Sequence, residues 1–349
     1  MISTQVLIAG QGLAGSLLAW ELWQHGIDFR VMDPSEQHTS SKAAAGLFQP
    51  LVARKIRQAD GVEEMLPVMK AAYTALENEL EVKLLHEIPS AKLISIEEAP
   101  LWEMAMEGAL KPYVRSIIPS GEIKGLRSGM TGVITGHSGF LEVSGLIYGM
   151  ARWLSEKNLL IPARLDYDSI CLEPEKVIIN NLVEAQTVVF CEGPAALANP
   201  WFGQAGLSVN KGEVIEILAP ELAERFIIRG EVFLLPLGMG RFRVGATYSR
   251  KPVDNEPSPA GLKELTEKLE NIIHVPYQVA DHWAGIRPVA RDRQPVMGFH
   301  PRHPQLAIFN GLGSKGVMQA PLRAEQMRKL LTEKGYELPN EVWVRRFLR

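Results

Sequence analysis

The sequence predicts an α/β protein in which a discontinuous, parallel-sheet domain carries an inserted α+β domain with a mostly antiparallel sheet. Three observations predict this fold. Short, continuously apolar strands occur near the start, in the middle and near the end of the chain. Segments with helical spacing of apolar residues follow the first and the last of these strands. Strand-like runs separated by glycine and proline turns lie between them.

Length and composition agree with two globular domains. The chain has 349 residues, of which 46% are hydrophobic and 22% are charged, as is ordinary for folded proteins. We assign residues 1–85, 141–205 and 284–349 to the parallel-sheet domain. Residues 86–140 and 206–283 then form the inserted domain, which we expect to bind the substrate.

Composition also argues against several classes of function. A formal net charge of −3 gives no general attraction for nucleic acid. The two cysteines are not in a C-x-x-C pair and the histidines are scattered, so we expect neither a disulfide framework nor a metal site. The N-terminus lacks a basic region and a long apolar run, so we expect no export signal, no membrane span and a cytoplasmic location.

The first elements follow the order strand, helix, strand. Residues 5–9 form an apolar run typical of a parallel strand that is buried on both faces. Apolar residues recur at helical spacing over residues 13–25, and Gly26 is suited to a left-handed helix cap. Residues 29–32 then predict a second strand, which ends at Asp33.

The turn between the first strand and the helix reads G-Q-G-L-A-G. Gly10 allows a tight turn, Gly12 lets the backbone approach a diphosphate, and Gly15 lets the helix pack closely on the strand. The helix N-terminus, which contains Leu13 and Ala14, would face the phosphate charge. This arrangement predicts a Rossmann-like site for a dinucleotide.

Asp33 narrows the choice of dinucleotide. It follows Gly15 by 18 residues and is placed to accept hydrogen bonds from the adenosine ribose. Its charge would repel a 2′-phosphate, which disfavours NADP. FAD and NAD are both compatible with this first motif.

A second glycine-rich turn, F-N-G-L-G-S-K-G-V over residues 309–317, directly precedes the last predicted helix, residues 317–334. Free N–H groups and the positive end of the helix dipole would stabilise negative charge at the N1–C2=O edge of a reduced flavin. A nicotinamide would gain nothing similar, so this turn favours FAD. The candidate cofactor contacts in it are Gly311, Gly313, Ser314, Lys315, Gly316 and Val317.

The remaining expected elements complete both domains. Further helices are expected over residues 62–81, 146–156 and 261–273. Further strands are expected over residues 187–191, 214–218, 232–235, 242–247 and 306–309.

Several motifs, in order along nearly the whole chain, resemble those of the D-amino-acid oxidase and glycine oxidase superfamily of FAD-dependent oxidoreductases. The resemblance implies that S-S-K-A-A-A-G-L, residues 40–47, approaches the diphosphate, ribityl chain and ring of FAD. It also implies that Gly193 lies beside the adenosine, although Cys191 and Glu192 replace the usual pair of small residues. The contacts implied in the first of these segments are Ser40, Ser41, Lys42, Ala45, Gly46 and Leu47.

The segment W-A-G-I-R-P-V, residues 283–289, resembles the family motif whose arginine binds the substrate carboxylate. The resemblance therefore implies that Arg287 offers two parallel N–H donors to a carboxylate. The alternative is that Arg287 forms an ion pair between the domains. Arg291 and Arg293, which lie close by in the sequence, are expected to be solvated at the surface.

Other pocket positions are implied by the same resemblance. Phe233 occupies a position where amino-acid oxidases often carry a tyrosine, so the hydroxyl that would contact the carboxylate is missing. We also place Tyr248 in the substrate pocket and give Arg287 and Lys315 catalytic roles. The sequence has no histidine or cysteine suited to covalent attachment, so we expect non-covalent FAD.

The expected function is an FAD-dependent oxidoreductase that oxidises the C–N bond of a small-molecule amino acid or secondary amine by hydride transfer to flavin N5. One alternative is the flavin module that oxidises a carboxymethylaminomethyl group on a modified transfer-RNA uridine, which residues 313–316 and 320–322 resemble. The negative net charge makes nucleic acid the less favoured partner. A second alternative is a non-catalytic FAD-binding subunit.

Overall fold

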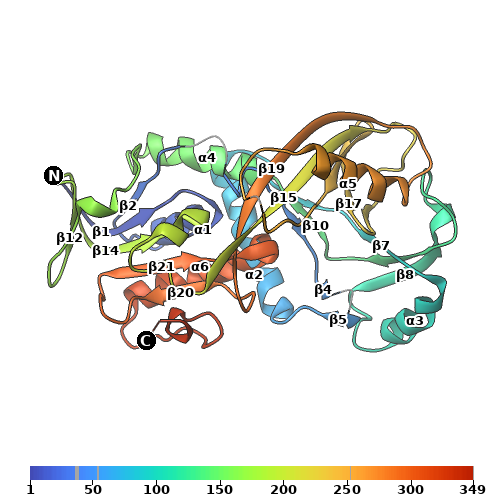
Figure 1. Cartoon of the computed structure of the whole chain (residues 1–349). Helices are drawn as coiled ribbons and strands as arrows, with labels where there is room; N and C mark the ends of the chain where they lie inside the picture. The colour runs from blue at the N-terminus through green and yellow to red at the C-terminus, as the bar shows by residue number, and fades with distance from the viewer. Residues whose placement is uncertain (36–38, 53–54, 252, 349) are drawn as a thin grey trace.

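The computed structural model describes residues 1–35, 39–52, 55–251 and 253–348. Two large sheets form the two ends of the molecule, with helix α2 (Val62–Leu80) between them (Figure 1). Within the ranges described, no helix combines the length and the apolar character that crossing a membrane requires.

The first sheet has a parallel core built from distant parts of the chain. Its parallel strands, in spatial order, are β11 (Leu160–Ile161), β2 (Phe29–Met32), β1 (Ile2–Ala9), β14 (Val183–Phe190) and β21 (Leu306–Asn310). Antiparallel strands extend this core beyond β14 and β21, namely β13 (Val177–Ile179), β12 (Ile170–Leu172) and β20 (Val296–Phe299).

Both faces of the first sheet are covered, which explains why its strands are continuously apolar. Val6 and Ile8 of β1 face a core formed with the helices, whereas Leu7 and Ala9 face a second core on the other side. The helices on the first face are α1 (Leu13–Gln24), α2, α4 (Val143–Glu156) and α6 (Gly316–Thr332).

The second sheet is antiparallel except for one pair. Its order is β19 (Gln278–Ala290), β15 (Leu207–Leu218), β18 (Arg241–Gly245), β17 (Phe233–Gly238), β16 (Ile227–Arg229), β7 (Ser90–Ile94), β9 (Thr131–Thr135) and β8 (Val114–Pro119). Only β16 and β7 run parallel to each other among these neighbours. Helix α5 (Pro259–Glu270) packs on one face through residues such as Leu265.

Small elements connect the two sheets. Strand β10 (Gly139–Leu141) pairs with β3 (Leu47–Phe48) and β6 (Leu85–Glu87), and β4 (Leu51–Val52) pairs with β5 (Arg57–Gln58). Helix α3 (Ala99–Glu107) lies beside β8 at the far end of the second sheet (Figure 1).

The expected helices and strands are present, with shifted ends. The largest differences are β15 and β19, whose pairing extends from Leu207 opposite Ala290 to Leu218 opposite Gln278. Polar residues such as Lys211 and Glu213 interrupt the apolar pattern of β15, so its full length was not evident from the sequence. Strand β19 also passes continuously through residue 284, where we had placed a domain boundary.

Candidate functional site

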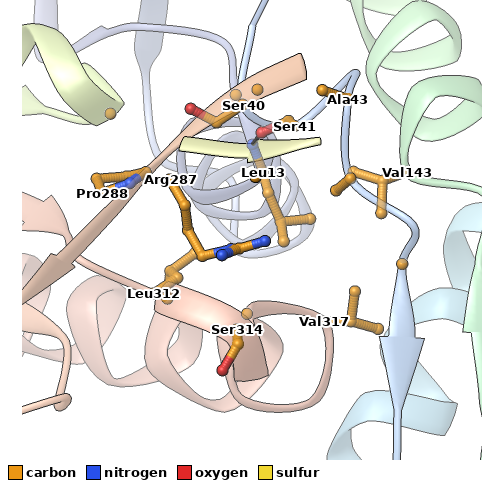
Figure 2. Close-up of a pocket in the computed structure, with 18 of the residues that line it drawn as sticks. Leu13, Ser40, Ser41, Ala43, Val143, Arg287, Pro288, Leu312, Ser314 and Val317 are labelled. Carbon is orange, nitrogen blue, oxygen red and sulfur yellow. Dashed lines mark hydrogen bonds between the residues drawn. The ribbon is translucent and has the colours of Figure 1, made fainter. Parts of the chain in front are cut away.

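A cavity of about 1040 Å³ lies between the two sheets. Its wall combines the turn before α1, the segment from Thr39 to Val52, the start of α6 and one face of the second sheet. Figure 2 shows Leu13, Ser40, Arg287, Ser314 and Val317 around this space. Segments that are far apart in the sequence therefore share one site.

The three glycines of the first turn have different surroundings. Gly10 has φ +103°, and a Cβ there would lie 2.6 Å from the carbonyl oxygen of Cys191. A Cβ at Gly15 would lie 1.9 Å from the carbonyl oxygen of Gly10, so the helix could not approach the strand with any larger residue. Gly12 lines the cavity, and the nearest atom to a Cβ there is Ser41 Oγ at 3.2 Å.

Asp33 and Ser41 hold this turn in place. The Gln11 N–H donates to Asp33 Oδ2 at 2.7 Å, and the Ser35 N–H donates to Asp33 Oδ1 at 2.7 Å. The Leu13 N–H, at the start of α1, donates to Ser41 Oγ at 3.0 Å. Asp33, Leu13, Ser41 and the adjacent Ala14 all line the cavity.

The small-residue segment after Asp33 is fastened to the second sheet. The Ser40 hydroxyl donates to the carbonyl of Ile286, and Trp283 Nε1 donates to the carbonyl of Ala43 at 3.2 Å. From this segment, the expected contacts that line the cavity are Ser40, Ser41, Ala45, Gly46 and Leu47. Lys42 lies outside the lining, with its Nζ 4.6 Å from the ring centre of Tyr148.

At the end of β14, the cavity wall contains a partly buried carboxyl group. Glu192 accepts hydrogen bonds from the Tyr167 hydroxyl at 2.8 Å and from Asn199 Nδ2 at 3.0 Å. Burial raises the pKa of Glu192, and these hydrogen bonds act in the opposite direction. Gly193, with φ +58°, also lines the cavity. Tyr167 is a lining residue that the sequence reasoning missed.

The second glycine-rich turn enters α6 at the cavity wall. Gly313, Ser314, Lys315, Gly316 and Val317 line the cavity. Gly311 does not; it has φ +72°, and a Cβ there would lie 3.0 Å from Leu207 Cδ2. The first turns of α1 and α6 therefore both face one space, and each brings the positive end of a helix dipole.

Arg287 extends from β19 into the cavity (Figure 2). Its Nη1 donates to Asn210 Oδ1 at 2.9 Å, and Nη2 lies 3.2 Å from the position a Cβ would take at Gly212. Burial lowers the pKa of Arg287, and the charge of Tyr248 acts in the opposite direction. Within the described ranges, Arg287 forms no ion pair.

The two other expected pocket residues lie differently. Phe233 lines the cavity opposite Gly245, where a Cβ would lie 2.8 Å from the Phe233 ring. Tyr248 is 61% exposed and does not line the cavity, although it lies near enough to Arg287 to affect its pKa.

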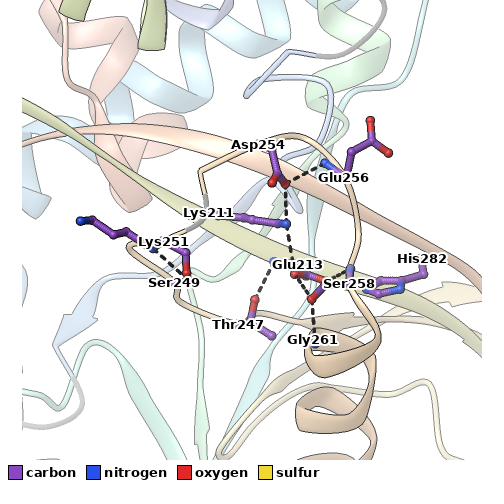
Figure 3. Close-up of polar contacts among 10 residues, drawn as sticks. All are labelled: Lys211, Glu213, Thr247, Ser249, Lys251, Asp254, Glu256, Ser258, Gly261 and His282. Atoms are coloured by element: carbon purple, nitrogen blue, oxygen red, sulfur yellow. Dashed lines mark hydrogen bonds and ion pairs between the residues drawn. The ribbon is translucent and has the colours of Figure 1, made fainter.

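A buried polar cluster holds the segment that contains Tyr248 (Figure 3). Lys211 Nζ lies 2.6 Å from Asp254 Oδ1 and 3.5 Å from Glu213 Oε1. Glu213 also accepts hydrogen bonds from the Ser258 N–H and hydroxyl, both at 2.8 Å, and lies 2.9 Å from His282 Nε2. The cluster is on the α5 side of the sheet, because Gly212 between Lys211 and Glu213 faces the cavity.

The alternation of side chains along the second sheet explains which of its residues line the cavity. Residues that share the cavity face are Ser90, Lys92, Gly212, Val214, Ile227, Arg229, Phe233, Gly245, Gly285 and Arg287. Lys92 and Arg229 were missed in the sequence, because their short strands became recognisable as cavity walls only once the strand order was known.

The sequence pattern of the family described as "FAD dependent oxidoreductase" matches residues 5–330, so the chain belongs to this family. FAD is accordingly its cofactor, and the NAD alternative left open by the first motif is removed. The cavity fits this group, because Gly12 and the small residues of the Thr39–Val52 wall leave space beside two helix N-termini.

Similar proteins include oxidases of amines. Glycine oxidase of Bacillus licheniformis is 26% identical over 155 residues, which is 42% of this chain and 42% of that protein. The putative thiamine biosynthesis oxidoreductase ThiO of Rhizobium etli is 22% identical over 357 residues, covering 95% of this chain and 98% of that protein. The crystal structure of glycine oxidase from Bacillus cereus superimposes with a TM-score of 0.80 at 20% identity, covering 97% of this chain and 99% of that one, which shows the shared fold.

Proposed function

We propose that this chain oxidises the C–N bond of an amino acid or secondary amine that carries a carboxylate. The observation that supports this most directly is Arg287, a partly buried cation on the cavity wall that forms no ion pair with the residues described. A desolvated guanidinium without a counter-ion favours binding of an anion. The amine oxidases among its relatives support the same class of reaction.

In this proposal Arg287 orients the substrate. Asn210, which is 1% exposed, fixes Nη1 at 2.9 Å, so the guanidinium has a defined position. Gly212 leaves Nη2 accessible, because a side chain there would press against it. A carboxylate bound to this group places the neighbouring carbon reproducibly, which is a large part of what a binding site contributes to rate.

The first turns of α1 and α6, together with residues 40–47, would hold FAD. This cofactor supplies the group that accepts two electrons and the α-hydrogen of the substrate. The substrate leaves as an imine, which water hydrolyses. Lys315, at the start of α6, adds positive charge to the wall. Leu13, Val143 and Val317 exclude water from the same region (Figure 2).

The first test is an anaerobic titration of the flavin absorbance with D- and L-amino acids, glycine, sarcosine and other secondary amines. Bleaching by one class of amine would support the proposal. A flavoprotein that none of them bleaches would contradict it, and a salt-sensitive shift with RNA would then favour the transfer-RNA alternative.

The second test replaces Arg287 by Leu and by Lys. We expect Arg287→Leu to keep its flavin but to lose about 100-fold or more in kcat/KM with carboxylated amines, because charge-assisted hydrogen bonds are lost. Arg287→Lys should recover only part of the rate, since an ammonium lacks the fork of two parallel donors. The control is Arg241→Leu at the start of β18, where the exposed guanidinium pairs with Glu216. Unchanged turnover in Arg287→Leu would refute the carboxylate site.

A further inference from the structure

A second arginine that forms no ion pair with the residues described lines the same cavity. Arg229 ends β16, and its side chain is only partly accessible. Across the part of the chain that the structure describes, it forms no hydrogen bond and no ion pair. Burial lowers the pKa of Arg229 to about 10. A desolvated cation that no protein group compensates favours a ligand of opposite charge.

The strand register places another cationic residue directly beside Arg229. Lys92 of β7 is its partner in the parallel β16–β7 pair, and Lys92 also lines the cavity. On the other side, Phe233 of β17 is opposite Arg229. Since directly opposed residues of neighbouring strands point to the same face, Lys92, Arg229 and Phe233 form one continuous row on the cavity wall.

The nearby acidic residue forms no ion pair with Arg229 in the part of the chain that the structure describes. Glu231, in the turn after β16, reaches the cavity wall but is exposed, and its Oε1 accepts a hydrogen bond from Asn271 Nδ2 at 3.3 Å. The Arg229 end of the cavity is therefore positively charged.

Arg229 and Arg287 lie at two ends of the same face. The strands between them, in order from β19, are β15, β18 and β17. The register puts Trp283 in the row of Arg229, so Arg287 is also offset by four residues along β19. With about 4.8 Å per strand and about 3.3 Å per residue, their backbones are on the order of 23 Å apart, and the two long side chains reduce the distance between their charges. One elongated ligand can therefore contact both.

We propose that Arg229, with Lys92 beside it, forms a second anion subsite, so that the substrate is an amino or imino acid with a second anionic group remote from the first. This deepens the proposed function and rests on it. Arg287 binds the carboxylate next to the reacting carbon, and Arg229 binds the distal anion. Phe233, between the two, contacts the apolar part of the chain.

The diphosphate of the cofactor does not explain Arg229. The candidate diphosphate site is at Gly10 and Gly12, on the first sheet, whereas Arg229 lies among β7, β16 and β17 of the second. FAD content therefore separates the two possibilities. A variant that lacks the Arg229 charge retains its flavin if the residue serves the substrate, and loses it if the residue serves the cofactor.

The decisive kinetic experiment compares matched substrates that differ by one charge. The pairs are glutamate with glutamine, 2-aminoadipate with its side-chain amide, and 2-aminopimelate with its side-chain amide, each as both enantiomers. We expect the native protein to prefer the member with the additional anionic group. Arg229→Met should lower the kcat/KM for that member about 10- to 100-fold, whereas the kcat/KM for the matched compound should stay within about threefold of the native value. Arg229→Lys should restore part of the preference, and Arg241→Met is the control for loss of an arginine elsewhere on this sheet.

A binding experiment keeps this test independent of turnover. Acetate, succinate, glutarate and adipate, which have no amine to oxidise, are titrated while the flavin spectrum is recorded. The subsite is supported if one dicarboxylate binds more tightly than acetate and if this difference disappears in Arg229→Met. This support holds even if no amine reduces the flavin, which is the result that would contradict the proposed function. Three results would overturn the subsite. They are equal binding of acetate and all dicarboxylates, an equal loss of kcat/KM for both members of each substrate pair, and loss of FAD from Arg229→Met.

Discussion

Gly12 and Gly15 belong to one motif but meet different physical requirements. Gly15 packs against the carbonyl oxygen of Gly10, so its need for a missing side chain arises within the protein. Gly12 faces the cavity, and Ser41 Oγ, at 3.2 Å, is the nearest atom to a Cβ there. Substitution at Gly12 should consequently affect the cofactor more than the fold.

Gly12→Val is expected to fold but to purify with little FAD, because its side chain would occupy the space that the diphosphate needs. The measurement is the ratio of flavin to protein absorbance, together with the urea midpoint of the apoprotein. The matched control is Gly121→Val, since Gly121 lies in an exposed turn and the nearest atom to a Cβ there is 3.7 Å away. A Gly12→Val protein with full flavin content would contradict the diphosphate assignment.

At the residue scale, glycine positions were easier to predict than side-chain directions. The spacing of Gly10, Gly12 and Gly15 within a strand–turn–helix context specifies backbone requirements that are local in the sequence. Lys42 and Tyr248 lie outside the cavity lining, which residue type alone does not indicate. For Lys42 the direction depends on Tyr148 of α4, a neighbour more than a hundred positions away in the chain.

At the scale of elements, α6 depends on α2 at its first turn. Pro321 lies inside α6 and has no N–H, so the carbonyl of Val317, four residues earlier, has no helical partner. The Tyr73 hydroxyl of α2 donates to that carbonyl at 2.8 Å, and Tyr73 is fully buried. Burial also raises the pKa of Tyr73, so its hydroxyl stays protonated. One buried hydrogen bond thus completes the end of α6 that lines the cavity.

Tyr73→Phe should lower the free energy of unfolding by about 1–3 kcal/mol, because it leaves the Val317 carbonyl buried without a donor. In a Pro321→Ala background the new N–H can bond that carbonyl, so the same substitution should cost less. Urea unfolding of both single variants and the double variant measures the coupling, which we expect to reach about 1 kcal/mol. Strictly additive effects would show that the hydroxyl does not replace the bond missing at Pro321.

At the scale of the whole molecule, the cluster around Glu213 joins β15, β19 and the N-terminal end of α5 (Figure 3). Burial acts to raise the pKa of Glu213, but hydrogen bonds from Ser258 and the charges of Lys211 and His282 outweigh it, so the pKa is lowered. A lowered carboxyl pKa stabilises the folded protein above the unfolded-state pKa, and this stabilisation is lost as the pH falls through the folded-state pKa.

Glu213→Gln should therefore be less stable than the native protein at neutral pH, by about 1–3 kcal/mol, because charge-assisted hydrogen bonds are weakened. The difference should shrink as the pH falls below the ordinary carboxyl value of 4.5. Urea midpoints across this pH range test the expectation. Glu267→Gln is the control, since Glu267 is 63% exposed and pairs with Lys263 on the same helix. A difference that is independent of pH would contradict an ionised Glu213.

The sequence by itself determined the features that depend on neighbours along the chain. The strand–glycine–helix order at each end specified the class of cofactor site, and the family pattern over residues 5–330 agrees with it. Arg287 was identified through the resemblance of residues 283–289 to a family motif, and its role as a substrate ligand stays a prediction. Local steric rules and helix dipoles act over a few residues, so a sequence records them directly.

Only the tertiary structure decided which side chains share the cavity. Arg229 and Lys92 come from short strands whose partnership depends on a parallel pairing between β16 and β7, which are separated by more than a hundred residues. Residues two apart on a strand share a face, but which face becomes a cavity wall depends on the packing of α5 on the opposite side. The burial of Arg229, and its lack of an ion pair with the residues described, depend on this packing and so could not be predicted from the sequence.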